Sequence, residues 1–206
     1  MRWFVPRTIR HARDDSGMTG IIYGRDESGL KPNGARLSGG LVVDTDNYGP
    51  LGDIDAVTIH HSAGPRAPSK AKAQSLHAAY QRLHIQEFGT GGHSRGDIGY
   101  HFAMDDLGRF YRLRPYQNKG THVGGWNSGN LGIMLHGNYV HDKLTDDQNA
   151  SLKWLFQGGF HALFGEPEAG IHVVRGHQEW PGHGSNACPG TNLMRHLAWL
   201  RSTEDF

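Results

Sequence analysis

Three separate segments of the sequence carry side chains that can bind a metal ion. His60 and His61 end the run VTIHH, His177 follows the run VVRG, and Cys188 lies in the loop sequence GSNACPG. Two imidazoles and one thiolate would supply three protein ligands and leave a fourth tetrahedral position for water. Catalytic zinc sites have this arrangement, because structural zinc sites fill all four positions with protein ligands. The residue types therefore predict a metal centre that activates water and polarises a carbonyl group.

Each of these residues also has a simpler explanation when it is considered alone. The single cysteine of the chain, Cys188, cannot form an intrachain disulfide, and a lone cysteine is most often an inert core residue. Each of the 15 histidines is, taken singly, more often a surface or hydrogen-bonded residue than a ligand. The metal hypothesis therefore depends on a fold that brings the three segments together.

The hydrophobic pattern predicts such a fold between residues 51 and 206. Short apolar runs predict strands at residues 55–60, 98–104, 109–113, 131–135 and 171–175, and the sequence DDLG suits a hairpin between the second and the third. Helices are predicted over residues 69–88, after Thr145 and after Thr191. This mixture predicts an α/β domain with a mixed central β-sheet flanked by helices on both faces.

The predicted helices have apolar faces and one recognisable end. Thr145 and Gln148 match a capping box, in which each side chain binds a free backbone amide at the start of the helix. In the first helix, the i, i+3, i+4, i+7 spacing predicts a buried stripe of Leu76, Ala79, Tyr80 and Leu83. In the later helices, the residues expected to point inward are Leu152, Leu155, Phe156, Phe160, Leu163, Leu193, Leu197 and Leu200.

Residues 1–50 differ in composition from the rest of the chain. They contain a turn signal every few residues, such as SGMTG, KPNG and DNYGP, and only short strand candidates at 20–23 and 41–43. We expect a loop-rich N-terminal extension, packed on or tethered to a domain of residues 51–206.

The charge and hydropathy of the chain exclude several classes of partner. Its 206 residues include 21 Lys and Arg against 20 Asp and Glu, a formal net charge of +1, so nucleic acid is not expected. No run approaches the roughly 18 apolar residues of a membrane span, and the N-terminus lacks the long apolar stretch of a signal peptide. We therefore expect no membrane span, no export signal and synthesis in the cytoplasm.

The order of the motifs IHHSA, GYHF, NxxxLGIxL, GHxE and ACPG resembles the zinc-dependent N-acetylmuramoyl-L-alanine amidase family. This family includes T7-type phage lysozyme and the peptidoglycan recognition proteins, and the resemblance covers about residues 54–200. It implies the amidase fold, one zinc ion per chain held by His60, His177 and Cys188, and a catalytic tyrosine at Tyr100. It also implies hydrolysis of the amide bond between N-acetylmuramic acid and L-alanine in peptidoglycan.

The resemblance implies a substrate-binding loop as well. His122 in GTHVGGWNSGN matches a histidine that lines the substrate groove of relatives near the metal. Trp126 and Asn127 follow in the same loop, and an aromatic plane and an amide suit a sugar face and N-acetyl or peptide groups. The alternative for Trp126 is a half-buried anchor of the loop.

Two positions depart from the family pattern. Asn186 stands where the family often has a lysine or threonine that assists the oxyanion, so we expect a weaker, neutral donor there. His183, in a longer loop than usual, could supply the missing cation near the substrate or replace His177 as a metal ligand. Met134 stands where some recycling relatives have a glutamate that acts as general base, so another group would have to accept the proton.

The resemblance leaves three biological settings open. A phage endolysin would act on the bacterial cell wall after release from the cytoplasm. A non-catalytic recognition module would bind peptidoglycan without cleaving it, and an intracellular amidase would recycle soluble muropeptides. In each setting the partner is peptidoglycan or a muropeptide, and we expect a monomer.

Overall fold

A single β-sheet runs through the computed structural model, which describes residues 8–10, 21–86, 95–164 and 171–203. Within these residues the sheet has seven strands in the order β1-β2-β5-β4-β6-β3-β7. The strands are β1 (Thr8–Arg10), β2 (Ile21–Tyr23), β3 (Ala56–His61), β4 (Phe102–Met104), β5 (Phe110–Arg112), β6 (Asn130–Leu135) and β7 (Val173–Gly176).

The strand directions confirm that the sheet is mixed. β3 lies between β6 and β7 and is parallel to both, and β6 is also parallel to β4. β4 and β5 form the predicted antiparallel hairpin, and Gly108 takes a φ of 67° in its turn. Because β3, β6 and β7 run in the same direction, their carboxyl ends meet at one edge of the sheet.

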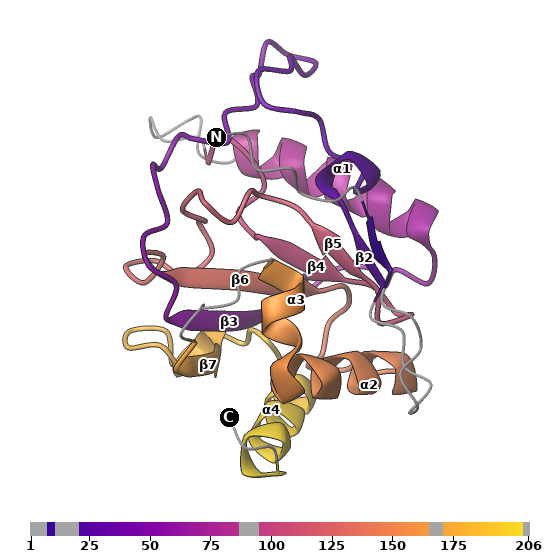
Figure 1. Cartoon of the computed structure of the whole chain (residues 1–206). Helices are drawn as coiled ribbons and strands as arrows, with labels where there is room; N and C mark the ends of the chain where they lie inside the picture. The colour runs from indigo at the N-terminus through magenta and orange to yellow at the C-terminus, as the bar shows by residue number, and fades with distance from the viewer. Residues whose placement is uncertain (1–7, 11–20, 87–94, 165–170, 204–206) are drawn as a thin grey trace.

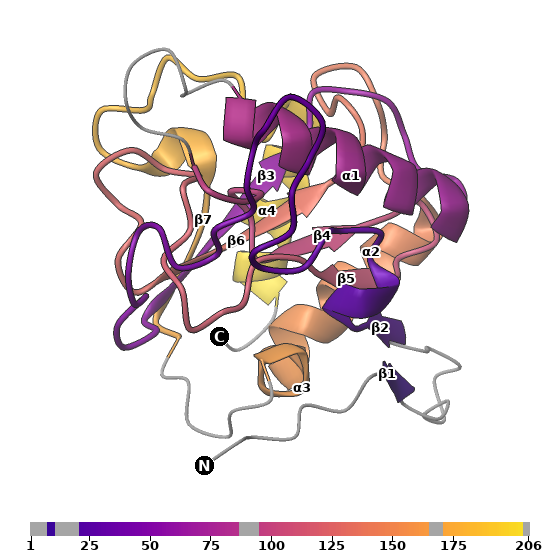
Figure 2. The same ribbon diagram turned by 90° about the horizontal axis from the view of Figure 1, so that it is seen from above.

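Helices cover both faces of the sheet, as predicted (Figures 1 and 2). One face packs against α1 (Lys70–Gln86), and the other packs against α2 (Asp146–Trp154), α3 (Phe160–Phe164) and α4 (Thr191–Thr203). Successive side chains of β6 point to opposite faces of the sheet. Ile133 therefore belongs to the apolar cluster with α2 to α4, and Met134 belongs to the cluster with α1.

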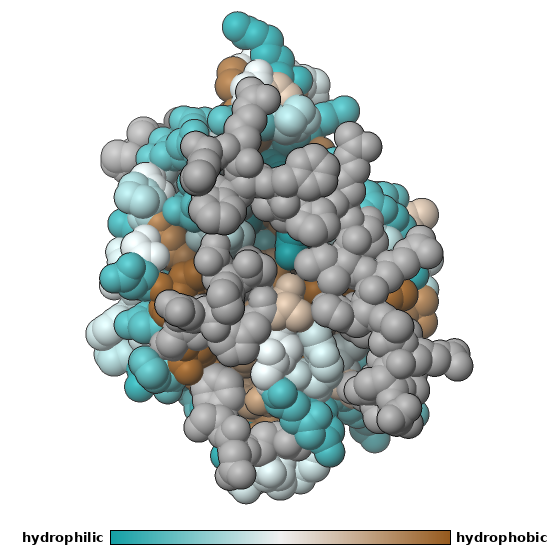
Figure 3. Space-filling view, in the orientation of Figure 1, coloured by the Kyte–Doolittle hydropathy of each residue, from teal (hydrophilic) through white to brown (hydrophobic). Residues whose placement is uncertain are grey.

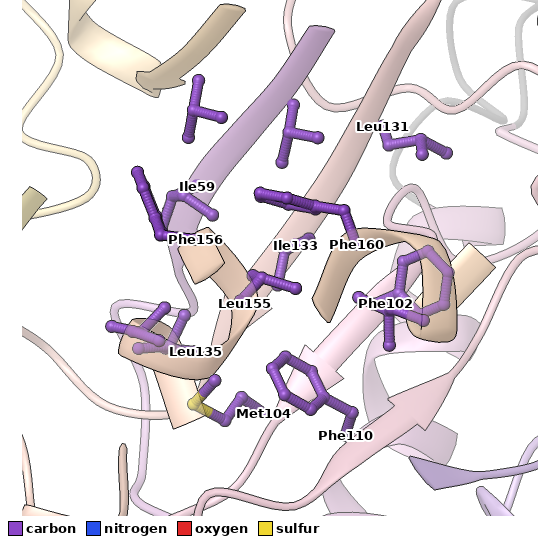
Figure 4. Close-up of a cluster of buried hydrophobic side chains, with 14 of the residues drawn as sticks. Ile59, Phe102, Met104, Phe110, Leu131, Ile133, Leu135, Leu155, Phe156 and Phe160 are labelled. Carbon is purple, nitrogen blue, oxygen red and sulfur yellow. The ribbon is translucent and has the colours of Figure 1, made fainter. Parts of the chain in front are cut away.

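The larger apolar cluster lies between the sheet and α2 to α4 (Figure 4). Ile59 and Ile133 of the sheet belong to it together with Phe156 and Phe160. The capping box of Thr145 and Gln148 is present at the start of α2. α2 continues into a short π-helical segment, Leu155–Gly159, which breaks at Gly158, where a φ of 106° favours glycine, and α3 follows the break. All eight inward positions predicted for these helices are buried: Leu152, Leu155, Phe156, Phe160, Leu163, Leu193, Leu197 and Leu200.

The predicted apolar stripe of α1 is only partly confirmed, since Leu76 is buried and Tyr80 packs against the core, whereas Leu83 is 43% exposed. The buried face also includes His77, Gln81 and His84. These polar side chains are buried because they have partners. His77 contacts the Ser28 carbonyl, and the Gln81 amide donates to Asp97. Apolar periodicity alone could not identify this face.

Part of the predicted N-terminal extension contributes to the sheet. β2 pairs with β5 in parallel, and the residues after it pack along α1 through bonds such as that from Gln74 to the Glu27 carbonyl. The candidate strand at 41–43 forms only an isolated bridge, between Arg36 and Val42. Residues 21–50 are therefore packed on the domain.

Both hydrophilic and hydrophobic residues are visible on the surface of the molecule (Figure 3). On the face seen in Figure 3, brown hydrophobic residues are visible near both the left and the right margins, with teal hydrophilic residues beside them. In the parts of the chain that the structure describes, none of the helices combines the length and the apolar character needed to cross a membrane.

Arg114 connects three loop segments from a buried position. Its side chain donates to the carbonyl groups of Thr45, Arg95, Asp97, Ile98 and Lys119. Each buried carbonyl that loses its donor costs about 1–3 kcal/mol. We expect Arg114→Met to lower the free energy of unfolding in urea by at least about 3 kcal/mol. Arg195→Met, at an exposed position, serves as the control and should change it by less than about 0.5 kcal/mol.

Candidate metal centre

The fold brings His60, His177 and Cys188 together at one edge of the sheet. His60 lies near the end of β3, and His177 begins the short helix η3 (His177–Glu179) directly after β7. Cys188 lies in the loop before α4. Because β3 and β7 are parallel neighbours, both histidines emerge at the same edge. The ligand atoms of the three residues lie within 4.8 Å of one another.

The spacing and chemistry of these donors suit a tetrahedral metal ion. Zinc–nitrogen bonds of about 2.0–2.1 Å and zinc–sulfur bonds of about 2.3 Å place neighbouring ligand atoms about 3.4–3.7 Å apart. The Cys188 Sγ atom lies 3.5 Å from His60 Nδ1, within that range. His60 is 1% exposed and Cys188 is 9% exposed, so the site is largely shielded from solvent. The residues therefore fit a metal site with three protein ligands.

Burial keeps both imidazoles neutral, the state that a metal ligand requires. Desolvation lowers the pKa of His60 well below its usual value, and the nearby His122 and His177 lower it further. Desolvation also lowers the pKa of His177 to about 4, with a further contribution from His183. Burial raises the pKa of the Cys188 thiol to about 12, although the backbone N–H of His61 opposes this shift. The metal-free site therefore holds a protonated thiol.

This thiol predicts the pH dependence of metal binding. Because the raised pKa keeps Cys188 protonated near neutral pH, binding of Zn²⁺ as a thiolate complex must release one proton. The two histidines are already neutral and add no further proton. We expect the Zn²⁺ affinity to rise about tenfold per pH unit between about pH 6.5 and 8.5, measured by chelator competition. An affinity that does not change over this range would contradict the assignment of Cys188 as a thiolate ligand.

Tyr100 lies beside the metal ligands. Its ring centroid is 5.1 Å from that of His60, and the residue directly precedes the segment that leads into β4. His84 of α1 helps to position it, since the His84 ring accepts a hydrogen bond from the backbone N–H of Gly99 and lies 5.7 Å from the Tyr100 ring. His84 is a site residue that the sequence did not reveal, because its only signal was a histidine on a helix face.

His122 lies behind His60, and the structure does not place it along an open groove. It is 8% exposed, and its Nδ1 atom is 3.0 Å from His60 Nε2. Its Nε2 atom is 3.1 Å from the carbonyl oxygen of Asn130. Both ring nitrogens therefore have partners inside the protein, so the contact with a metal ligand replaces the expected contact with substrate.

His183 lies behind His177 in the way that His122 lies behind His60. Its Nδ1 atom is 3.1 Å from His177 Nε2, and its Nε2 atom is 2.9 Å from the Gly124 carbonyl oxygen. Among the described residues, the group able to hold a metal contains His177 and not His183. The structure therefore favours His177 as the ligand over the alternative left open by the sequence.

The two other residues of the predicted substrate-binding loop differ in exposure. The Asn127 side chain accepts hydrogen bonds from the backbone N–H groups of His122 and Val123, so it shapes the loop. Trp126 is 41% exposed, donates its indole N–H to the Pro181 carbonyl and packs 5.2 Å from the Trp180 ring. Trp126 is thus both a loop anchor and an aromatic surface.

Asn186 and His61 each form a hydrogen bond with Cys188. The Oδ1 atom of Asn186 accepts a hydrogen bond from the Cys188 backbone N–H, which leaves the Nδ2 group of this exposed residue as a donor. The backbone N–H of His61 lies 3.4 Å from Cys188 Sγ, while the His61 ring accepts from the Tyr139 backbone. Among the described residues, the group able to hold a metal does not include His61.

Residues 50–191 match the sequence model of a protein family described as N-acetylmuramoyl-L-alanine amidase. The chain is also 32% identical to peptidoglycan-recognition protein SC2 of Drosophila melanogaster over 144 residues, which are 70% of this chain and 72% of that protein. These matches confirm the family that the order of the sequence motifs predicts.

Solved structures share the fold. Drosophila peptidoglycan recognition protein SA superposes with a TM-score of 0.65 at 21% identity, covering 87% of this chain and 91% of that one. Human PGRP-IBETAC, solved in complex with glycosamyl muramyl pentapeptide, superposes with a TM-score of 0.62 at 17% identity, covering 86% and 94%. At these identities the likeness establishes the architecture of the sheet and its helices.

Proposed function

Because the chain belongs to the N-acetylmuramoyl-L-alanine amidase family, we propose that it is a zinc-dependent hydrolase of peptidoglycan. The bond cleaved is the amide between N-acetylmuramic acid and L-alanine. The observation that carries this proposal is the convergence of His60, His177 and Cys188, whose ligand atoms lie within 4.8 Å of one another. Three ligands leave a position for a reacting molecule, which a purely structural zinc site does not have.

Different residues of the chain would bind the metal and stabilise the oxyanion. His60, His177 and Cys188 would hold one zinc ion, which supplies Lewis acidity for activating water and polarising the amide carbonyl. Tyr100, whose ring lies 5.1 Å from that of His60, is placed to donate its hydroxyl hydrogen to the oxyanion that develops on the substrate carbonyl. Asn186 adds a donor through Nδ2, since its Oδ1 atom is already bonded.

Trp126 is the best candidate for contact with the substrate among the loop residues. It is 41% exposed, and an aromatic plane packs well against the apolar face of a sugar. Its bond to the Pro181 carbonyl joins the loop before β6 to the loop that leads to Cys188. The glycan next to the cleaved amide is therefore the part of the substrate assigned to it.

The decisive experiment is digestion of purified sacculi by the zinc-loaded protein, with and without a chelator. New L-alanine N-termini and free muramic lactyl groups, identified by mass spectrometry, are expected only without chelator. Cleavage that persists at the same rate after complete metal removal would overturn the proposal.

A recognition module that binds without cleavage is the second candidate. It is favoured by one specific observation, namely that the relatives found by sequence are named as peptidoglycan-recognition proteins. The same digestion distinguishes the two candidates, because a recognition module would sediment with sacculi and release no new N-termini. The intact set of two histidines and one cysteine supports the hydrolase.

The choice of substrate distinguishes lysis from recycling. An amidase of the endolysin type is expected to cleave intact sacculi, whereas a recycling enzyme would cleave soluble anhydromuropeptides and leave sacculi unchanged. The endolysin setting and the site of action stay predictions from the sequence.

A further inference from the structure

Both histidine ligands of the candidate metal site are supported in the same way. Nε2 of His60 lies 3.0 Å from Nδ1 of His122, and Nε2 of His177 lies 3.1 Å from Nδ1 of His183. The second histidine of each pair then uses Nε2 to contact a backbone carbonyl oxygen. The site thus contains two chains of the form ligand histidine, second histidine, carbonyl.

The carbonyl at the end of each chain determines the positions of the protons. A carbonyl oxygen can only accept a hydrogen bond, and a neutral imidazole has a single N–H group. In its neutral form, each of His122 and His183 must therefore be protonated on Nε2 and accept on Nδ1. The ligands His60 and His177 must in turn donate from Nε2, which leaves the Nδ1 lone pair of each ligand for a metal ion.

Both carbonyl oxygens belong to one segment, the loop that leads into β6 together with Asn130, the first residue of that strand. His122 contacts the carbonyl of Asn130, and His183 contacts the carbonyl of Gly124. The loop is itself fixed, because Asn127 accepts from two backbone N–H groups and the Asn130 amide donates to the Trp126 carbonyl. We name residues 121–130 the anchor loop.

The backbone around His122 leaves room for its ring and for little else. A Cβ atom added to Gly132 would lie 2.7 Å from His122 Cγ, and one added to Gly120 would lie 2.8 Å from His122 Cδ2. Neither distance is compatible with a side chain, so glycine at both positions is required for the ring to lie behind His60. The placement of His122 is therefore built into β6 and the segment before the loop.

We propose that His122 and His183 are positioning residues that fix both ligand imidazoles in the Nε2-protonated tautomer, with the anchor loop as their common support. The inference rests on the metal site of the proposed function. It extends that function by assigning neither residue to the substrate and by making metal affinity depend on a loop that supplies no ligand. Mutation of partners of this kind typically lowers metal affinity by about 10- to 100-fold.

The test compares substitutions that remove the acceptor with substitutions that keep it. In His122→Leu and His183→Leu the ligand N–H loses its acceptor, whereas in His122→Asn and His183→Asn the amide oxygen replaces Nδ1. We expect Zn²⁺ affinity, measured by chelator competition, to fall about 10- to 100-fold in the leucine variants and less than about fivefold in the asparagine variants. The larger loss is expected for His122, because its contact with His60 is buried while the contact of His183 with His177 is only partly buried.

The tautomers provide a second measurement that needs neither metal nor substrate. Nitrogen NMR of the metal-free protein should show His60 and His177 protonated on Nε2, and each leucine variant should lose this preference at its own ligand. His141→Leu, at an exposed position, is the matched control for both measurements. If His122→Leu does not fold, His183→Leu carries the test, because His183 lies in a partly exposed loop.

Two results would overturn the inference. One is zinc affinity within twofold of wild type in a folded leucine variant, and the other is an Nδ1-protonated ligand in the metal-free wild type. Failure of the proposed function would be recognised separately, as wild-type protein that binds zinc tightly, shows the expected tautomers and cleaves no peptidoglycan.

Discussion

Replacing Cys188 by serine is expected to abolish zinc binding and peptidoglycan cleavage together. A serine hydroxyl stays protonated near neutral pH and is a poor zinc ligand, so the site would keep only two imidazoles. If each of three ligands carries roughly a third of about 12 kcal/mol of metal-binding free energy, the loss of one weakens affinity on the order of 10³-fold. Metal content after dialysis and release of alanine N-termini from sacculi measure the two effects.

The same substitution should leave the metal-free fold intact. The serine Oγ atom can accept a hydrogen bond from the His61 backbone N–H, as Cys188 Sγ does at 3.4 Å. The thermal midpoint of the variant should therefore match that of wild type stripped of metal. His141→Ala, which changes an exposed histidine, is the control and should keep both metal and activity. A metal-free Cys188→Ser protein that cleaves at the wild-type rate would refute the ligand assignment.

The convergence of the three possible metal ligands could be predicted because His60 and His177 lie at the ends of recognisable strands and Cys188 lies in a recognisable loop. The β-branched run before His60 and the run before His177 both become parallel strands, β3 and β7. Parallel strands that neighbour each other end at the same edge, so two residues separated by more than a hundred positions meet there. The ligand group depends on strand geometry, and strand geometry is visible as a short apolar pattern.

The histidines behind the ligands could not be predicted in the same way. His122 and His60 are 62 positions apart, and their contact depends on the position of a loop whose conformation no periodic pattern determines. Family resemblance therefore predicts a substrate contact for His122, whereas the structure places its ring against His60. The buried face of α1 was partly missed for a related reason, because His77 and Gln81 are buried only through partners that belong to residues 21–31 and 95–98.

Tyr100→Phe is expected to separate metal binding from catalysis. The substitution removes one hydroxyl group and keeps the ring that packs 5.1 Å from His60, so zinc affinity should stay within about twofold of wild type. If the hydroxyl stabilises the developing oxyanion, its loss should lower kcat about 10²- to 10³-fold. KM should change little, because the interaction is made in the transition state and not with the bound substrate.

The control for this prediction is Tyr23→Phe, which removes a hydroxyl from β2, a strand separated from β3 by β5, β4 and β6. That variant should keep the wild-type kcat. A Tyr100→Phe protein with full zinc content and unchanged kcat would show that Tyr100 only packs against His60, and the oxyanion would then depend on the metal and on Asn186. A Tyr100→Phe protein that loses zinc would instead assign the tyrosine to the support of the ligands, alongside His122 and His183.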